Sequence, residues 1–181
     1  DDTGGVATTE EYNGSSWTGG GAMGTARSVF GSAGTQTAGL GFGGQPGDTT
    51  ATEEYNGSSW TAGGSLGTAV YANAGAGIQT SALSFGGNHR PPVTAQTEGY
   101  DGSSWSSRPN LGTAVLQHGS AGASNAAAVS FSGYTTTQVA GTEEFTSSIN
   151  VITAGAFSSG GPMNTGRRYL SGFGLRTAGV A

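Results

Sequence analysis

Two histidines and a recurring glutamate are the residues of this chain that could support acid–base chemistry or bind a metal. His89 and His118 are the only histidines in 181 residues, and neither has a second ligand at a spacing of the H-x-x-x-H type. Cysteine is absent, which excludes thiolate chemistry and disulfides. We therefore predict that both histidines lie on the surface or in loops. We also predict no metal, no cofactor and no enzymatic activity.

One glutamate recurs in each copy of an internal repeat: Glu10, Glu53, Glu98 and Glu143. Carboxylates in a ring could bind Ca²⁺ together with backbone carbonyls. The interpretation we favour is structural, because the four residues belong to the constant part of the repeat and would lie far apart. In that case each carboxylate accepts a hydrogen bond from a neighbouring backbone N–H group or a Trp indole. The adjacent glutamates are expected to face solvent: Glu11, Glu54 and Glu144.

The loops that depart from the repeat are the candidate binding sites, because loops carry function on a repeated scaffold. Residues 88–92 combine an imidazole and a cation, His89 and Arg90, with two prolines. Arg108 lies in a second unusual loop, and Tyr134 begins the segment equivalent to residues 88–92 in the next copy. Variable surface turns are the alternative explanation for all of these segments.

Composition and charge narrow the classes of partner. The chain has 36 glycines, no lysine, six arginines spread along its length and a net charge of −5, so no basic stripe could follow a nucleic-acid backbone. No apolar run approaches the length of a membrane span. We expect neither nucleic-acid binding nor membrane insertion.

An internal repeat organises the whole sequence. The segment Thr9–Thr18, TEEYNGSSWT, returns at Thr52–Thr61 and, slightly changed, at Thr97–Ser106; a degenerate copy begins at Thr142. The steps between copies are 43, 45 and 45 residues, a period typical of a four-stranded unit. Gly and Thr are abundant and no segment keeps a 3.6-residue period, so the sequence predicts an all-β fold.

An Asn-Gly dipeptide, as at Asn56-Gly57, is typical of a two-residue type I′ hairpin loop. Alternation along the flanking strands then places Glu53, Tyr55 and Trp60 on one face. The segments 28–30 and 40–42 are predicted to be inner strands. We expect the aromatic residues of the repeat to be buried between adjacent units: Tyr12, Trp17, Tyr55, Trp60, Tyr100 and Trp105.

The order of these motifs resembles the kelch repeat, in which a di-glycine is followed by a Tyr, a Trp and a Met/Leu-x-Thr-x-Arg stretch. Gly43-Gly44, Tyr55, Trp60 and Leu66-Gly67-Thr68 match in that order, and the following copy matches in the same way. The resemblance implies a β-propeller of about four blades, each a four-stranded antiparallel sheet. It does not extend to the propeller oxidases, since the Tyr–Cys–His copper set is missing. The Gly/Thr/Ser-rich copies are also similar to repeats in virion proteins of environmental bacteriophages.

The phase of the repeat predicts one domain, 1–181, closed into a ring. Units are expected at 19–61, 62–106 and 107–152, with a connecting loop at 153–165, and the outer hairpin 8–18 is expected to pair with inner strands at 166–181 to complete the fourth. The alternative is a longer array cut near a unit boundary; because the sequence begins with Asp1 rather than Met, we expect it to be processed or part of a longer protein. Function is expected to be structural and binding, in a phage appendage, fibre or other virion or extracellular protein. Structural proteins, or cell-surface proteins or glycans bound in adhesion, are the expected partners; homo-oligomers and a lectin-like, glycan-binding propeller remain alternatives.

Overall fold

A computed structural model describes residues 4–89, 92–147 and 156–159, the last four by their backbone only. These residues form fourteen β-strands and no helix, as the sequence predicts. None of the described segments is therefore a helix that could cross a membrane.

Strands that follow one another in the chain pair side by side, so that three antiparallel sheets of four strands form in sequence order. The first contains β3 (Gly31–Thr35), β4 (Ala38–Phe42), β5 (Thr52–Tyr55) and β6 (Trp60–Ala62). The second contains β7 (Ala74–Ile78), β8 (Ser81–Phe85), β9 (Thr97–Tyr100) and β10 (Trp105–Arg108). The third contains β11 (Gly119–Ser124), β12 (Ala127–Phe131), β13 (Thr142–Thr146) and β14 (Ala156–Ser159). A two-stranded hairpin, β1 (Glu10–Tyr12) and β2 (Trp17–Gly19), precedes them.

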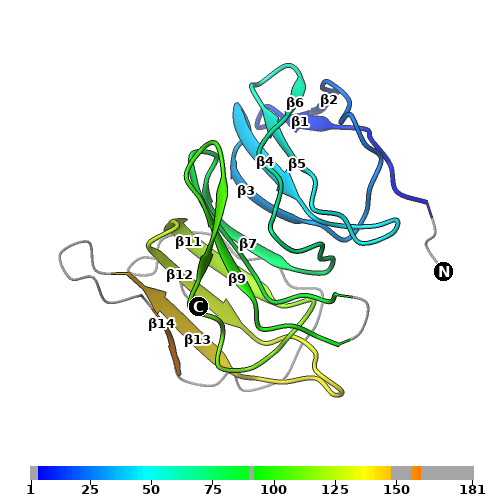
Figure 1. The fold of residues 1–181 in the computed structure, drawn as a ribbon. Coiled ribbons are helices and arrows are strands. Elements are labelled where there is room, and N and C mark those ends of the chain that lie inside the picture. The colour runs from blue at the N-terminus through cyan, green and yellow to red at the C-terminus, as the bar shows by residue number, and fades with distance from the viewer. Residues whose placement is uncertain (1–3, 90–91, 148–155, 160–181) are drawn as a thin grey trace.

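The sheets follow one another in space as they do in the chain (Figure 1). The first strand of each sheet packs against the first strand of the next, β3 against β7 and β7 against β11. The first two sheets each take their strands from one predicted unit, although β6 and β10 extend one and two residues past the expected boundaries at 61 and 106. The prediction of a connecting loop over 153–165 is wrong in part. β14 lies within it and pairs with β13, so the fourth copy, which has lost the tight Asn-Gly turn, still forms its outer strand after a longer connection.

Two local predictions are also wrong. The inner strand begins at Gly31 rather than at Ser28, and residues 28–30 make only a single bridge to Gln45. The outer hairpin has a four-residue loop rather than a two-residue one. Tyr55 pairs with Trp60, and the backbone N–H of Asn56 donates to the carbonyl oxygen of Ser59.

The longer loop forms because the first loop residue caps it with its side chain. Asn56 Oδ1 accepts hydrogen bonds from the backbone N–H groups of Ser58 and Ser59, at 3.0 and 2.9 Å. Asp101 makes the same contacts in the next copy, and the N–H groups of Ser104 and Ser103 lower the pKa of its carboxyl group to about 2. A two-residue slip keeps side-chain parity, so the predicted sharing of one face by Tyr55 and Trp60 is correct.

The core lies between the sheets and is built from a few large residues among many small ones. One cluster joins the first two sheets: Leu40, Phe42, Leu66, Val70, Ala82 and Tyr100. A second joins the second and third: Ala74, Ala76, Leu83, Phe85, Leu111, Val115, Ala128 and Phe145. Small residues are needed where the inner strands meet, since a Cβ on Gly75 would lie 2.3 Å from the carbonyl oxygen of Ser32.

The described part is therefore an all-β series of four-stranded antiparallel sheets. The predicted pairing of 8–18 with 166–181 is not tested, because residues 166–181 lie outside the described ranges. Among the described residues β1 and β2 form a sheet of two strands.

A glycine after each of the first two outer hairpins, Gly21 and Gly64, makes room for the loop of the next hairpin, and this leads to a test. A Cβ on Gly64 would lie 2.1 Å from the carbonyl oxygen of Ser103, whereas a Cβ on Gly19 would meet no atom within 4 Å. We expect Gly64→Ala to lower the free energy of unfolding by about 1–3 kcal/mol through overpacking. Gly19→Ala should change it by less than about 0.5 kcal/mol. Urea denaturation measures both, and equal effects of the two substitutions would contradict the close approach.

Candidate functional site

Each of the first three outer hairpins carries a pair of aromatic rings, which we call the ring pair. Tyr and Trp face each other directly across the hairpin, with ring centroids 5.2 Å apart for Tyr12–Trp17, 5.0 Å for Tyr55–Trp60 and 4.9 Å for Tyr100–Trp105. The four-residue loop creates this register.

The ring pair binds the hairpin of the preceding unit through its polar tips. Trp60 Nε1 donates a 2.9 Å hydrogen bond to Thr9 Oγ1, and the Tyr55 hydroxyl donates to the carboxylate of Glu11. This second hydrogen bond, followed by burial, raises the pKa of Tyr55. The first sheet thus fastens onto β1 and β2 through two hydrogen bonds and two rings.

The second sheet repeats these contacts on the first. Trp105 Nε1 donates to Thr52 Oγ1 at 2.9 Å, and the Tyr100 hydroxyl donates to Glu54 at 2.5 Å. Burial and the Glu54 contact raise the pKa of Tyr100 to about 12. The expectation that Glu11 and Glu54 face solvent is therefore wrong, because each is the acceptor for the next unit's Tyr and both are half-buried.

The interface between the second and third sheets has neither the Tyr–Glu nor the Trp–Thr hydrogen bond. Residues that would make the Tyr–Glu bond are replaced on both sides of it. Phe145 takes the place of Tyr, and Gly99 takes the place of the glutamate that the hydroxyl would need. No Trp follows Phe145 in the sequence. Thr97 Oγ1, the equivalent of Thr9 and Thr52, is buried without a hydrogen-bond partner among the described residues. The fourth copy therefore differs from the others in both partners of the outer contact.

The first hairpin presents its ring pair to solvent. Tyr12 is 47% exposed and Trp17 is 66% exposed, while Tyr55 and Tyr100 are 3% and 0% exposed and Trp60 and Trp105 are half-buried. The prediction that all six rings are buried is wrong for Tyr12 and Trp17, because none of the described hairpins packs on them. This exposed ring pair is the candidate binding site.

The recurring glutamates accept backbone hydrogen bonds, as the structural interpretation predicts. Glu53 binds the N–H groups of Gly24 and Thr25 at 2.6 and 3.2 Å, in the connection that precedes its own sheet. Glu98 and Glu143 repeat this cradle with the equivalent Gly-Thr pairs. Glu10, in β1, is exposed. Within the described residues no three His, Asp or Glu side chains lie close enough to hold a metal ion.

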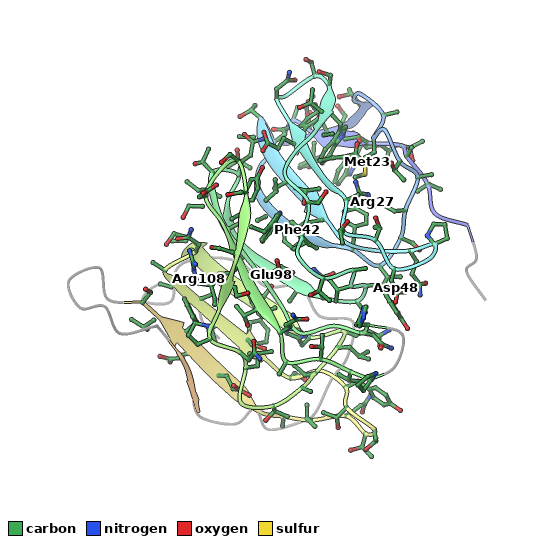
Figure 2. All side chains as sticks on the ribbon, viewed as in Figure 1. Met23, Arg27, Phe42, Asp48, Glu98 and Arg108 are labelled. Atoms are coloured by element: carbon green, nitrogen blue, oxygen red, sulfur yellow. The ribbon has the colours of Figure 1, made fainter. Side chains whose placement is uncertain are left out.

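One cradle contains a buried cation that the sequence analysis did not single out. Arg27, 2% exposed, forms an ion pair with Glu53 and donates from Nη1 to the carbonyl oxygens of Gly43 and Ala51, at 3.1 and 2.9 Å. Figure 2 shows Arg27 inside the first sheet region and Glu98 in the second. The sequence indicated this role only through the position of Arg27 in the Met/Leu-x-Thr-x-Arg stretch, where the two middle copies have Val.

The predicted loop residues lie on separate segments. His89 is exposed and its Nδ1 lies 2.7 Å from the carbonyl oxygen of Ala69. Arg108 ends β10, where it is half-buried, folds over Gly99 and binds Ser106 Oγ at 2.7 Å. Tyr134, half-buried, bridges Leu116 and Gln138. Arg90 lies outside the described residues. Asp48 belongs to the connection of the first sheet that corresponds to the one carrying His89 in the second. In Figure 2 Arg108 and Asp48 lie on opposite sides of the molecule.

A set of amide side chains was missed by the sequence analysis. The turn between the two inner strands of each sheet carries an amide that donates to the Tyr carbonyl of the preceding hairpin: Gln36 to Tyr12 at 3.2 Å, Gln79 to Tyr55 at 2.8 Å and Asn125 to Tyr100 at 2.8 Å. The recurrence of Gln or Asn at one place in the repeat was the signal. Inner and outer strands are thereby both linked to the preceding unit.

His118 is a buried ionisable side chain. It is 4% exposed and packs on Phe85, with centroids 5.5 Å apart. Neither ring nitrogen has a hydrogen-bond partner among the described residues. His118 lies in the connection just before β11, so the loop alternative of the prediction is correct and the surface alternative is wrong. His118 takes the place of Asn73 in the preceding copy.

No family model matches the sequence, and neither does any curated protein.

Burial of His118 predicts a dependence of stability on pH. Loss of hydration lowers the pKa of His118 from 6.5 to about 3, so between these values the unfolded chain takes up a proton that the folded chain does not. Stability should therefore fall as the pH drops below 6.5, by up to about 1.4 kcal/mol per pH unit. We expect His118→Asn, which copies Asn73, to flatten the profile between about pH 5 and 6.5, while His89→Asn leaves it unchanged. Unfolding measured across this range would contradict the account if the wild type and His118→Asn had the same slope.

Proposed function

We propose that this protein is a structural and binding module rather than an enzyme, built as a kelch-like β-propeller of about four blades. The observation that carries the proposal is the exposed ring pair. Every other ring pair is the attachment surface between two units, so Tyr12 and Trp17 form a surface already shaped to receive a polar hairpin. In a closed ring the hairpin that it receives is that of β13 in the same chain, and in an open array it is that of another protein. The partners we propose are other structural proteins, with homo-oligomers included.

The setting we propose is a virion, such as a phage appendage or fibre, or the extracellular space. Support comes from the resemblance to repeats of phage virion proteins and from the scarcity of ionisable and cysteine side chains. Stability then depends on backbone ladders and inter-unit rings rather than on disulfides.

The repeat itself supports closure of the ring. Residues 164, 165 and 167 stand at the sequence positions that correspond to Gly24, Thr25 and Arg27. In a closed ring that stretch would give Glu10 the same kind of cradle that Glu53 has. The polar face of β13, with Thr142, would then cover Trp17 as Thr9 covers Trp60.

Crosslinking tests closure cleanly because the chain has no cysteine. Residues Thr142 and Trp17 are changed to Cys together and treated with a short bis-maleimide. The matched control is Thr9→Cys with Trp60→Cys, whose native side chains are in contact. We expect both pairs to crosslink within one chain. Dimers linked through Thr142→Cys and Trp17→Cys, or no crosslink there while the control reacts, would contradict a closed ring.

A glycan-binding, lectin-like propeller is the second candidate, and the exposure of Trp17 favours it. Exposed aromatic rings with a polar edge suit stacking on sugars. Asn13, Ser15 and Ser16 belong to the polar loop beside the ring pair. The half-burial of Trp60 and Trp105 restricts this idea to one site on the described part rather than one per blade. Glycan binding that is lost in Trp17→Ala and retained in Ile78→Ala, which alters another exposed apolar side chain, would select this candidate over the first.

A further inference from the structure

The three glutamate cradles differ in what lies beside the carboxylate. In the first, Arg27 occupies the space and satisfies three oxygen atoms: the Glu53 carboxylate and the carbonyls of Gly43 and Ala51. This is a cation site filled by the chain itself.

The second cradle has the same oxygen-bearing positions and lacks the cation. Glu98 is 8% exposed and binds the N–H groups of Gly67 and Thr68 at 2.8 and 3.1 Å, as Glu53 binds its own pair. Gly86 and Gln96 stand where Gly43 and Ala51 stand, and the Gly86 N–H binds the Gln96 carbonyl just as that of Gly43 binds the Ala51 carbonyl. Val70 replaces Arg27 and brings no charge.

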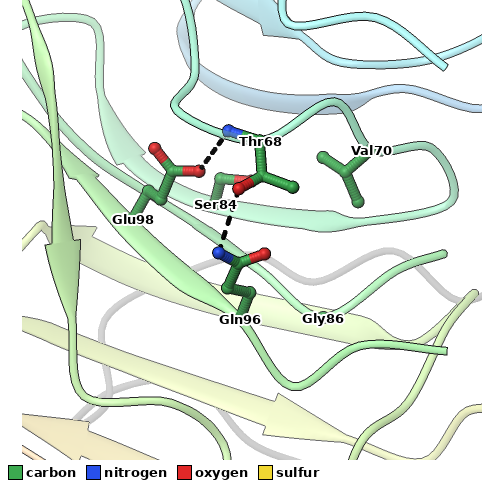
Figure 3. Close-up of a pocket in the computed structure, with 6 residues that line it drawn as sticks. All are labelled: Thr68, Val70, Ser84, Gly86, Gln96 and Glu98. Carbon is green, nitrogen blue, oxygen red and sulfur yellow. Dashed lines mark hydrogen bonds between the residues drawn. The ribbon is translucent and has the colours of Figure 1, made fainter. Parts of the chain in front are cut away.

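A cavity is left where the guanidinium would lie. It is about large enough for one water molecule. Its lining residues are Thr68, Val70, Ser84, Gly86, Gln96 and Glu98. Figure 3 shows Glu98 hydrogen-bonded to the Thr68 backbone N–H and Gln96 to the Thr68 hydroxyl, with the apolar side chain of Val70 also in the lining. Gln96 Nε2 donates to Thr68 Oγ1 at 3.0 Å, and no residue of the lining carries a positive charge.

The chemistry of the cavity selects its occupant. A buried carboxylate without a cation is costly, and removal of one partner from a buried pair leaves an uncompensated charge. Hard cations prefer carboxylate and carbonyl oxygens, and a single carboxylate among neutral carbonyls matches one positive charge better than two. The free volume is about that of one water molecule.

We propose that the cavity beside Glu98 binds a small monovalent cation, Na⁺ or K⁺, in the place that Arg27 fills in the preceding repeat. The cation stabilises the second sheet as the guanidinium stabilises the first. The site is independent of the exposed ring pair and of ring closure.

The melting temperature in NaCl, KCl and choline chloride at one ionic strength tests the site in solution. With Na⁺ or K⁺ about tenfold above its Kd, we expect a rise of about 3–6 °C relative to choline, which is too large for the cavity. Val70→Arg supplies the guanidinium and should abolish the difference. Arg27→Val opens the equivalent cavity beside Glu53 and should enlarge it. Equal melting temperatures in the three salts would overturn the proposal.

Crystals of the wild-type protein grown in RbCl or soaked in a thallium(I) salt test the position, whether or not the variants fold. The expected result is an anomalous peak bonded to Glu98 Oε1 and absent beside Glu53. A water molecule in the cavity with no anomalous signal would overturn the proposal.

Discussion

The contact between successive outer hairpins is the interaction on which the rest of this structure depends. A Tyr hydroxyl and a Trp indole N–H, held side by side by cross-strand pairing, reach a Glu and a Thr one unit back. The rings supply apolar burial and the polar tips set the register between sheets. Because each hairpin has an acceptor side and a donor side, the arrangement propagates from one unit to the next. It also leaves one donor side, Tyr12 and Trp17, uncovered among the described residues.

The rest of the sequence makes this contact geometrically feasible. Inner strands rich in Gly, Ala and Ser let neighbouring sheets approach closely, and Gly64 admits the loop of the next hairpin against the backbone. The recurring carboxylates tie each sheet to the connection before it, and the amides of Gln36, Gln79 and Asn125 tie the inner turns to the outer strands. Large side chains are few, so such backbone-directed hydrogen bonds carry much of the specificity between units.

The sequence contained the repeat and therefore most of the fold. A period near 45 residues and an aromatic hairpin motif predicted four-stranded antiparallel units, and alternation predicted that Glu53, Tyr55 and Trp60 share a face. The loop length was mispredicted because the Asn56 side chain, rather than the Asn-Gly backbone preference, determines the turn. The role of Glu11 and Glu54 was missed because alternation says which face a residue occupies and not what the next unit places against that face. The burial of His118 was missed because the sequence does not say which connections the neighbouring sheets cover.

The most direct test of the central contact is a double-mutant cycle on Tyr100 and Glu54, whose side chains are 2.5 Å apart. Urea unfolding is measured for the wild type, Tyr100→Phe, Glu54→Ala and the double variant. The account predicts that the two changes are not additive, with a favourable coupling energy of about 1–2 kcal/mol, as the natural Phe145 and Gly99 pair implies. Tyr12→Phe with the same Glu54→Ala change is the control and should show no coupling. Additivity within about 0.3 kcal/mol for the Tyr100 cycle would contradict the claim that this hydrogen bond joins the sheets.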